Sequence, residues 1–315
     1  MGKIAFIFPG QGSQTVGMGQ GLAGNHEKSK ALFKKADELL GYSLSDIMFE
    51  GPQEVLTKTV NTQPALLTVS TALLELFRES GIQADYAAGH SLGEYSALVA
   101  AGAISFDEGV CIVRKRGEFM EEAVPDGLGA MAAVLGLDRE PLAEAAAAVT
   151  SDGHPVQLAN INCPGQIVIS GTAEGVRLAG EKAKEAGAKR VKQLEVSGPF
   201  HSSLMEPAAE RLSDVLNGAK IRKAAIPVIA NADAMPMEDG ETIKANLVKQ
   251  LYSPVLWEDS VQKMIELGVD TFIEFGPGKV LGGLVKKISR DVKIYSVSDE
   301  QSCKDTIAAL KEEKE

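Results

Sequence analysis

One serine of the chain lies in a pattern that is typical of catalytic nucleophiles. Residues 89–93 read GHSLG, and in a G-x-S-x-G motif the small flanking residues permit a sharp turn that exposes the serine hydroxyl. The motif alone is weak, because the chain has 32 glycines. A strand candidate at 85–88 precedes it, however, and a compact apolar helix is predicted at 91–101. Ser91 therefore lies where a strand becomes a helix, and the first helical turn offers free backbone N–H groups, notably that of Leu92, to an oxyanion.

A serine hydroxyl needs a base to remove its proton, and imidazole titrates nearest to neutral pH. The chain has four histidines. His26 lies in a charged stretch, His154 lies in a DGHP turn, and His90 adjoins the serine, so that its side chain should point elsewhere. His201, within residues 197–203 (SGPFHSS), is therefore the candidate base. The alternative is that His201 is a histidine packed in a loop.

Three consecutive cations, residues 114–116 (RKR), lie on a helix predicted at 106–122. The apolar positions of this helix form one stripe, and Arg116 is three residues after Val113 and four before Met120. Arg116 is therefore expected at the edge of the buried face. Arginines in such places usually extend to solvent, so a solvated side chain and a ligand-binding side chain are the two alternatives.

A glycine-rich loop follows the first predicted strand. Residues 10–14 read GQGSQ, which matches neither the G-x-G-x-x-G nor the G-x-x-x-x-G-K-[ST] pattern, so nucleotide binding is not supported. The loop could present the backbone N–H of Gln11 as a second oxyanion donor. It could equally be a tight connection between strand and helix, and the sequence leaves both readings open.

The order of predicted elements indicates an α/β protein with an inserted lobe. An apolar run at 3–8 predicts a buried first strand. From about residue 129 the order is strand, helix, strand, strand, helix, strand, which is the βαββαβ unit of ferredoxin-like folds. These six elements are predicted at 130–135, 139–149, 156–161, 166–170, 174–186 and 190–196. We therefore predict a large α/β domain at 1–127 and 198–315 and a small lobe at 128–197.

Composition excludes several classes of function. A formal charge of −11 disfavours a general nucleic-acid or anionic-membrane surface, so any anionic substrate must be held by a few placed cations. Three cysteines that are far apart provide neither a disulfide framework nor a CxxC metal or redox site. No apolar run is long enough to span a bilayer, and the first residues lack the features of a signal peptide. We expect a cytoplasmic protein without a metal site.

Taken together, separated motifs of the chain resemble the malonyl-CoA:acyl-carrier-protein transacylase family. The resemblance covers nearly the whole chain in order and is far more specific than any single motif. The motifs are residues 10–14 (GQGSQ), 61–65 (NTQPA), 89–95 (GHSLGEY), Arg116, 198–202 (GPFHS), 253–255 (SPV) and 276–278 (GPG). It implies an α/β-hydrolase-like large domain with an inserted ferredoxin-like small lobe, and an active site between the two.

The resemblance also implies a role for each matched residue. Ser91 would be acylated, His201 would act as base and then acid, and the backbone N–H groups of Gln11 and Leu92 would form the oxyanion hole. The backbone carbonyl of Gln250 would orient the histidine in place of the usual carboxylate. Arg116 would hold the malonyl carboxylate, which suits a planar guanidinium, whereas an acetyl group offers no such charge.

Further residues are placed by resemblance around the substrate. Gln63 would line the pocket, and Phe200 looks like the malonyl-selective form of its motif, in which a smaller residue would admit a branched extender unit. The residues implied near the pantetheine arm are Asn160, Asn162, Gln166 and Asn231.

The reaction implied is transfer of malonyl from malonyl-CoA to the phosphopantetheine thiol of acyl carrier protein, supplying fatty acid synthesis, with no metal or redox cofactor. The alternatives are a serine thioesterase or hydrolase, a scaffold that keeps only the fold, and an acyltransferase of a polyketide pathway. A buried Arg116 would argue against the hydrolase. We expect a monomer whose partners are malonyl-CoA and the carrier protein.

Overall fold

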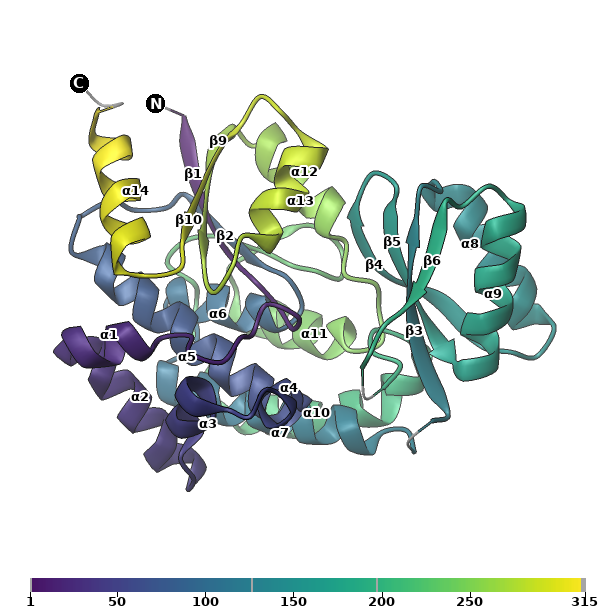
Figure 1. Ribbon diagram of the computed structural model, residues 1–315, viewed down its shortest axis with the longest axis horizontal. Helices are drawn as coiled ribbons and strands as arrows, with labels where there is room; N and C mark the ends of the chain where they lie inside the picture. Colours follow the sequence, from purple (N-terminus) through teal and green to yellow (C-terminus); the bar gives the residue numbers. More distant parts are fainter. Residues whose placement is uncertain (1, 126, 197, 313–315) are drawn as a thin grey trace.

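The computed structural model describes residues 2–125, 127–196 and 198–312. These residues form two sheets, of six and four strands, in two lobes that lie side by side (Figure 1). The larger sheet has the order β10-β9-β1-β2-β7-β8, and every neighbouring pair is parallel except β7 with β8. Its strands are β1 Lys3–Phe8, β2 Tyr86–Gly89, β7 Val228–Ile229, β8 Pro236–Met237, β9 Val269–Phe275 and β10 Lys293–Val297.

Helices cover both faces of this sheet, which is why β1 is an almost continuous apolar run. Phe6 and Phe8 point into the core that contains α5 (Thr59–Arg78) and α6 (Leu92–Ala100). Ala5 and Ile7 point to the opposite face, under α12 (Trp257–Glu266) and α13 (Val280–Ile288). The alternation of side chains along one strand thus serves two cores.

The remaining helices of the large domain pack around this frame, mostly on the α5 side (Figure 1). They are α1 Gln20–Asn25, α2 Glu27–Leu40, α3 Leu44–Glu50, α4 Gln53–Thr57, α7 Phe106–Glu122, α10 Glu206–Gly218, α11 Gly240–Gln250 and α14 Glu300–Glu312, with a 3-10 turn at Ser203–Met205. None of the helices in the described part of the chain is both long and apolar enough to cross a membrane.

The second sheet forms the small lobe and is antiparallel throughout, in the order β4-β5-β3-β6. Two helices cover one face of it and bury the core between helices and sheet. The elements in chain order are β3 Gly129–Leu135, α8 Arg139–Ser151, β4 Val156–Cys163, β5 Gln166–Thr172, α9 Ala173–Glu185 and β6 Arg190–Gln193. The predicted α/β class with its βαββαβ lobe is confirmed.

Two details concern the limits of the lobe. Strand β6 ends at Gln193, short of the predicted 196, because its pairing with β3 ends there and only the Leu194 N–H still bonds to Met131 O. The domain boundaries at 127/128 and 197/198 stay predictions, and residue 197 lies outside the described residues.

The lobes are joined along β4, which is an edge strand of the small sheet. Asn160 forms an isolated parallel bridge with Val255 of the large domain. The Ile161 N–H bonds to Val255 O at 2.9 Å, and the Val255 N–H bonds to Ala159 O at 2.8 Å. Pairing covers an edge that would otherwise be open and fixes the small lobe against the segment that follows α11.

Candidate active site

Ser91 lies at the sharp turn between β2 and α6, as the sequence predicted. It is the residue before the first turn of α6 and has φ 51° and ψ −107°, a conformation that L-residues rarely adopt. The turn depends on close backbone packing. A Cβ on Gly93 would lie 2.0 Å from Phe8 O, and one on Gly89 would lie 1.9 Å from the Gly93 carbonyl, so neither position accepts a side chain.

The side chain of Asn231 bonds to the backbone on both sides of this turn. Its Oδ1 accepts the Ser91 N–H at 2.7 Å, and its Nδ2 donates to Gly89 O at 2.7 Å. The side chain is fully buried, and both of these bonds are made to residues of the turn. The place near the pantetheine arm that the resemblance implied for Asn231 stays a prediction, whereas the structure shows its side chain bonded to the serine turn. The reason is physical: a buried, strained backbone needs polar partners, and an amide supplies one acceptor and two donors.

His201 is within hydrogen-bonding distance of the serine. Its Nε2 is 2.8 Å from Ser91 Oγ, and its Nδ1 is 2.8 Å from the backbone oxygen of Gln250. A carbonyl can only accept, so Nδ1 carries the proton and Nε2 is free to take the serine proton. Burial, followed by the nearby charge of Arg116, lowers the pKa of His201 to about 3, so the ring is neutral at physiological pH.

Arg116 is fully buried, beyond the edge position that its spacing suggested. Its Nη1 donates to Gln63 Oε1 at 2.7 Å. Its Nη2 donates to Ser91 Oγ at 3.0 Å and to Gln250 Oε1 at 2.9 Å, and the guanidinium lies over the Tyr95 ring. Burial lowers the pKa of the guanidinium, but an arginine side chain remains charged in proteins. A fixed positive charge therefore contacts the Ser91 hydroxyl.

Two backbone N–H groups near the serine have no hydrogen-bond partner within the described ranges. One belongs to Leu92, at the start of α6, and the other to Gln11, in the loop after β1. That loop packs closely on the serine turn, since a Cβ on Gly10 would lie 2.3 Å from His90 O. The Gln11 side chain is turned away and exchanges hydrogen bonds with Thr59 Oγ1. The two N–H groups predicted as oxyanion donors are thus both unpaired.

The small lobe contributes polar residues at its boundary with the large domain. Asn162 Oδ1 is 2.8 Å from His90 Nε2, and Gln166 Oε1 accepts from Lys287 Nζ at 3.0 Å. Asn160 is buried where β4 bridges to Val255. These contacts place the predicted asparagines and glutamine at the junction of the lobes.

Phe200, the residue before His201, is buried on the large-domain side. It packs so closely that a Cβ on Gly198 would lie 3.0 Å from its ring.

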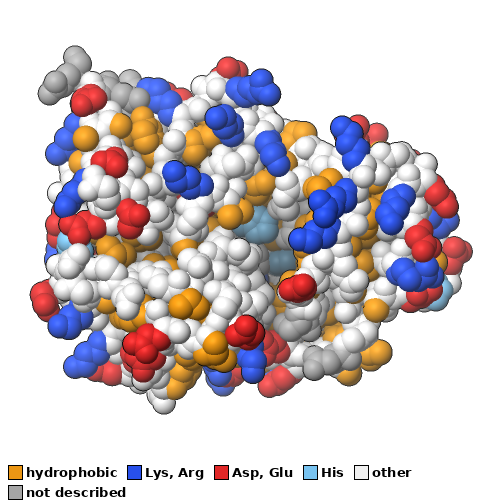
Figure 2. Space-filling model, viewed as in Figure 1, with side chains coloured by type: hydrophobic (Ala, Val, Ile, Leu, Met, Phe, Trp, Pro, Cys, Tyr) orange, Lys and Arg blue, Asp and Glu red, His pale blue; other side chains and the backbone are white. Residues whose placement is uncertain are grey.

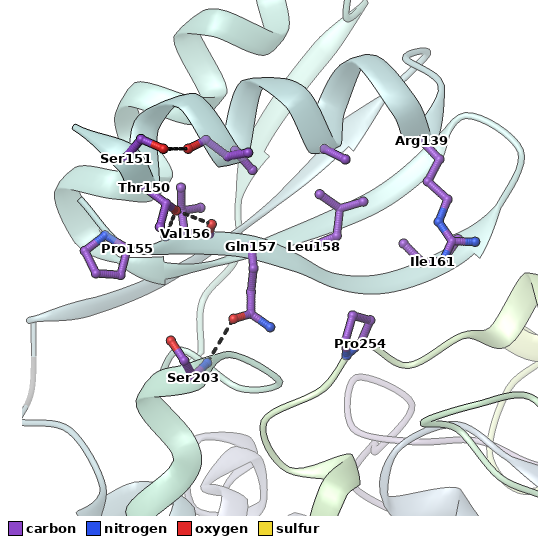
Figure 3. Close-up of a pocket in the computed structure, with 13 residues that line it drawn as sticks. Arg139, Thr150, Ser151, Pro155, Val156, Gln157, Leu158, Ile161, Ser203 and Pro254 are labelled. Atoms are coloured by element: carbon purple, nitrogen blue, oxygen red, sulfur yellow. Dashed lines mark hydrogen bonds between the residues drawn. The ribbon is translucent and has the colours of Figure 1, made fainter. Parts of the chain in front are cut away.

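One contact at the site was not predicted from the sequence. Gln157 points from β4 toward the large domain, where its Oε1 accepts the Ser203 N–H at 3.0 Å (Figure 3). Its Nε2 donates to His201 O at 3.3 Å and to Tyr252 O at 3.2 Å. His201 has a positive φ of 58°, so Gln157 secures a strained segment from the other lobe. A glutamine on a strand carries no sequence signal for such a contact.

Beside Gln157 lies a groove of about 580 Å³ between α8 and β4. Figure 3 shows Thr150, Leu158 and Arg139 around it. Ser91, His201 and Arg116 do not line this groove. The reacting groups are instead gathered at the junction of the lobes. No group of three or more potential metal ligands is found among the residues that the structure describes.

Comparison with known proteins gives a consistent result. Residues 5–306 match the family model described as acyl transferase domain. A protein of Bacillus subtilis named malonyl CoA-acyl carrier protein transacylase is 60% identical over 313 residues, which cover 99% of both chains. A protein of Staphylococcus aureus with the same name is 50% identical over 297 residues, which cover 94% of this chain and 96% of the other.

Solved structures agree with these sequence relatives. An acyl carrier protein S-malonyltransferase of Vibrio cholerae superposes with a TM-score of 0.94 at 46% identity, covering 96% of this chain and 99% of the other. A malonyl-transacylase in complex with the acyl-carrier protein of a type II PKS superposes with a TM-score of 0.95 at 43% identity, covering 98% and 99%.

Proposed function

Because the chain belongs to the malonyl CoA-acyl carrier protein transacylase family, it transfers malonyl groups from coenzyme A to acyl carrier protein, and we propose that Ser91 carries the group between them. The observation that supports this role most strongly is the position of Ser91 Oγ. It lies 2.8 Å from the His201 base and 3.0 Å from the Arg116 cation. A nucleophile, its base and a carboxylate-binding group thus meet at one atom.

In the first half-reaction Ser91 Oγ attacks the thioester carbonyl of malonyl-CoA while its proton passes to His201 Nε2. The bond from the carbonyl carbon to sulfur then breaks, and coenzyme A leaves as a thiol that takes the proton back from His201. In the second half-reaction the phosphopantetheine thiol of the carrier gives its proton to His201 and attacks the malonyl-serine. Collapse of that intermediate returns the proton to Ser91 and releases malonyl carrier protein.

The negative charge that develops on the carbonyl oxygen needs donors fixed in advance. The unpaired N–H groups of Gln11 and Leu92 are suited to this role, because neither must first give up another bond. The oxyanion therefore replaces no existing hydrogen bond within the described part of the chain.

Arg116 provides the selectivity for malonyl. Gln63 and Gln250 hold its two terminal nitrogens, and one Nη1 hydrogen remains available. Acylation of Ser91 also frees the Nη2 hydrogen that the serine hydroxyl accepts. The substrate carboxylate can then accept two hydrogen bonds from the fork, which an acetyl group cannot do. The bulk of Phe200 opposes branched acyl groups.

The buried charge favours transfer over hydrolysis, which was the alternative at the sequence level. Arg116 specifies an acyl group with a carboxylate, and a general thioesterase has no use for it. The polyketide alternative uses the same chemistry with another carrier. We propose fatty acid synthesis as the pathway that consumes the product.

We propose that the carrier protein docks on basic residues that lie beside the junction of the two lobes. Arg190 and Lys192 on β6 and Lys286 on α13 are exposed, and none has an ion pair among the described residues. Figure 2 shows blue side chains over both β6 and α13, on either side of a hollow in which histidine is visible. Such a local field attracts an acidic partner although the net charge of the chain is −11. Lys189, next to β6, has the same character.

The small-lobe amides Asn160, Asn162 and Gln166 are proposed to line the path of the pantetheine arm. We also propose that no metal or redox cofactor takes part, since thioester exchange needs only nucleophile, base and oxyanion donors. A cytoplasmic location is supported by three free cysteines, Cys111, Cys163 and Cys303. A monomer remains the proposed oligomeric state.

The proposed nucleophile is tested by intact-protein mass after brief exposure to malonyl-CoA. Wild type is expected to gain one malonyl group, Ser91→Ala none, and His201→Ala far less within the same time. Circular dichroism of each variant controls for folding. An adduct that persists in Ser91→Ala would overturn the assignment.

A further inference from the structure

A buried carboxylate lies under the proposed nucleophile, and the mechanism above gives it no role. Glu94, in the first turn of α6, has no exposed surface. Its Oε2 accepts the Asn231 N–H at 3.0 Å and Gln250 Nε2 at 2.8 Å, whereas Oε1 has no partner within the described residues. Burial raises the pKa of Glu94 to about 7, against the opposing effect of these bonds and of Arg116. A buried carboxylate is costly to the fold, so its presence needs a physical reason.

The first partner of Glu94 leads to the nucleophile. The Asn231 side chain bridges the Ser91 N–H and Gly89 O, at 2.7 Å each, and so spans the serine turn. Glu94 fixes the backbone N–H of the same asparagine. The strained conformation of Ser91 is therefore secured through Asn231, which Glu94 in turn holds in place.

The second partner leads to the base and to the cation. Glu94 is acceptor-only when ionised, so Gln250 must present its NH₂ group to it and direct Oε1 the other way, where Arg116 Nη2 donates at 2.9 Å. With the amide reversed, two oxygens would face each other at Glu94, and NH₂ would face the guanidinium. Gln250 Nε2 also donates to Ser91 O, and its backbone oxygen accepts from His201 Nδ1.

We propose that Glu94 is the positioning residue of this active site: its hydrogen bonds to Asn231 and Gln250 hold Ser91, His201 and Arg116 in one shared geometry. It is not a catalytic residue, because neither of its oxygens contacts a reacting atom. The inference rests on the roles proposed above for the serine, the histidine and the arginine. It also explains why the Gln250 side chain, and not only its backbone, is buried at the site.

Two substitutions separate hydrogen bonding from charge. Glu94→Gln keeps an oxygen at the Oε2 position and places NH₂ where Oε1 has no partner, so both bonds survive. Its kcat/KM for malonyl-CoA should stay within about tenfold of wild type. Glu94→Ala removes both bonds and leaves the Gln250 amide oriented only by Ser91 O, Asn231 Oδ1 and Arg116 Nη2. Its kcat/KM should fall on the order of 100-fold, since small displacements of reacting groups have effects of that size.

The decisive readout is the ratio of malonyl-enzyme to acetyl-enzyme formation, measured by intact mass per folded active site. A loss of stability alone changes the amount of active protein but not this ratio. In Glu94→Ala the ratio should fall, because Gln250 Oε1 is less firmly oriented and so holds Arg116 Nη2 less firmly toward the acyl group. In Glu94→Gln it should stay at the wild-type value.

Glu274 provides a matched control. It is also a buried carboxylate with two backbone bonds, from Leu281 N at 3.0 Å and Gly282 N at 2.8 Å, but it belongs to β9 and bonds to the first turn of α13. Glu274→Ala should lower the melting temperature and keep the wild-type ratio. The proposal is overturned if Glu94→Ala keeps the wild-type ratio and rate, or if Glu94→Gln is as impaired as Glu94→Ala. A wild-type enzyme that forms no malonyl adduct would instead contradict the role of Ser91.

Discussion

At the scale of single residues, the site differs from a serine triad in what faces the histidine. A neutral carbonyl, that of Gln250, accepts the Nδ1 proton, and a positive charge on Arg116 lies nearby. Burial and the Arg116 charge lower the pKa of His201, whereas the hydrogen bond to the Gln250 carbonyl raises it, so that the neutral ring prevails in the resting enzyme. In the proposed role of Arg116, the charge balance changes when the malonyl carboxylate binds, because the substrate then neutralises the cation that opposes protonation of His201.

This balance predicts an unusual pH profile for the first half-reaction. A base is active when deprotonated, and the pKa of free His201 is lowered to about 3. The kcat/KM for acylation should therefore not fall with a midpoint near 6.5 when the pH is lowered from 8 to 5. The pKa of His201 that governs kcat belongs to the enzyme with malonyl-CoA bound. It should be higher than the pKa that governs kcat/KM, because the malonyl carboxylate neutralises Arg116. Stopped-flow measurement across this range is the test, and a midpoint near 6.5 in kcat/KM would contradict the described burial.

A second prediction concerns Arg116 itself. Arg116→Ala should cost roughly 2–5 kcal/mol of transition-state stabilisation with malonyl-CoA, as expected for loss of one partner of a buried charge pair. The loss of transition-state stabilisation with acetyl-CoA should be much smaller. Arg116→Lys, which keeps the charge but not the fork, should lie between the two. Steady-state kinetics with both substrates give the answer, and equal losses for malonyl and acetyl would show that the arginine only supports the fold.

At this scale the sequence singled out candidate site residues but not the contacts that hold them. Helical spacing placed Arg116 at the edge of a buried stripe, but its full burial depends on Gln63 from α5 and Gln250 from α11. Neither partner is near it in sequence. The bracing by Asn231 and Gln157 was missed for the same reason, since contacts between distant segments leave no local pattern.

At the scale of elements, the serine turn requires that α6 approach the end of β1 with no side chain between them. A Cβ on Gly93 would lie 2.0 Å from Phe8 O. We predict that Gly93→Ala lowers stability by about 3 kcal/mol and also slows acylation, because relief of the contact must shift Ser91 and the Leu92 N–H together.

The matched control for that variant is Gly21→Ala. Gly21 is also helical, in α1, and a Cβ there would meet nothing within 4 Å. It should be neutral or slightly stabilising. Thermal unfolding of both variants is the measurement, and equal melting temperatures would contradict the described packing of the turn.

Elements were more predictable than contacts. The apolar run of β1 and the strand-helix alternation of the small lobe follow from hydrophobic periodicity, which is a local property. The end of β6 does not, because it is set by where pairing with β3 stops. The parallel bridge from β4 to Val255 likewise joins segments that only the fold brings together.

At the scale of the whole molecule, the distribution of charge matters more than its sum. The chain has a net charge of −11, yet Arg190, Lys192 and Lys286 remain without carboxylate partners in the ranges described. Elsewhere many cations are paired, as Arg211 is with Glu122. Unpaired cations beside the active site suit an acidic carrier, and the interaction should weaken as salt is added.

We predict that Arg190→Glu with Lys192→Glu raises KM for the carrier protein about tenfold and leaves acylation by malonyl-CoA unchanged. The control is Lys30→Glu with Lys34→Glu on α2, at the far end of the molecule in Figure 1, which changes the net charge equally. Steady-state kinetics with carrier as the varied substrate compare the pairs. An equal rise in KM for the carrier in both double variants would mean that total charge, not this surface, governs docking.

The central claim is that Ser91 holds malonyl for a thiol and not for water. The most direct test is to isolate the malonyl-enzyme and follow its mass with time, with and without carrier protein that bears phosphopantetheine. The account predicts loss of the adduct within seconds when the carrier is present, appearance of malonyl carrier protein in equal amount, and persistence of the adduct in buffer alone. Discharge at the same rate in buffer alone would contradict it and identify a hydrolase.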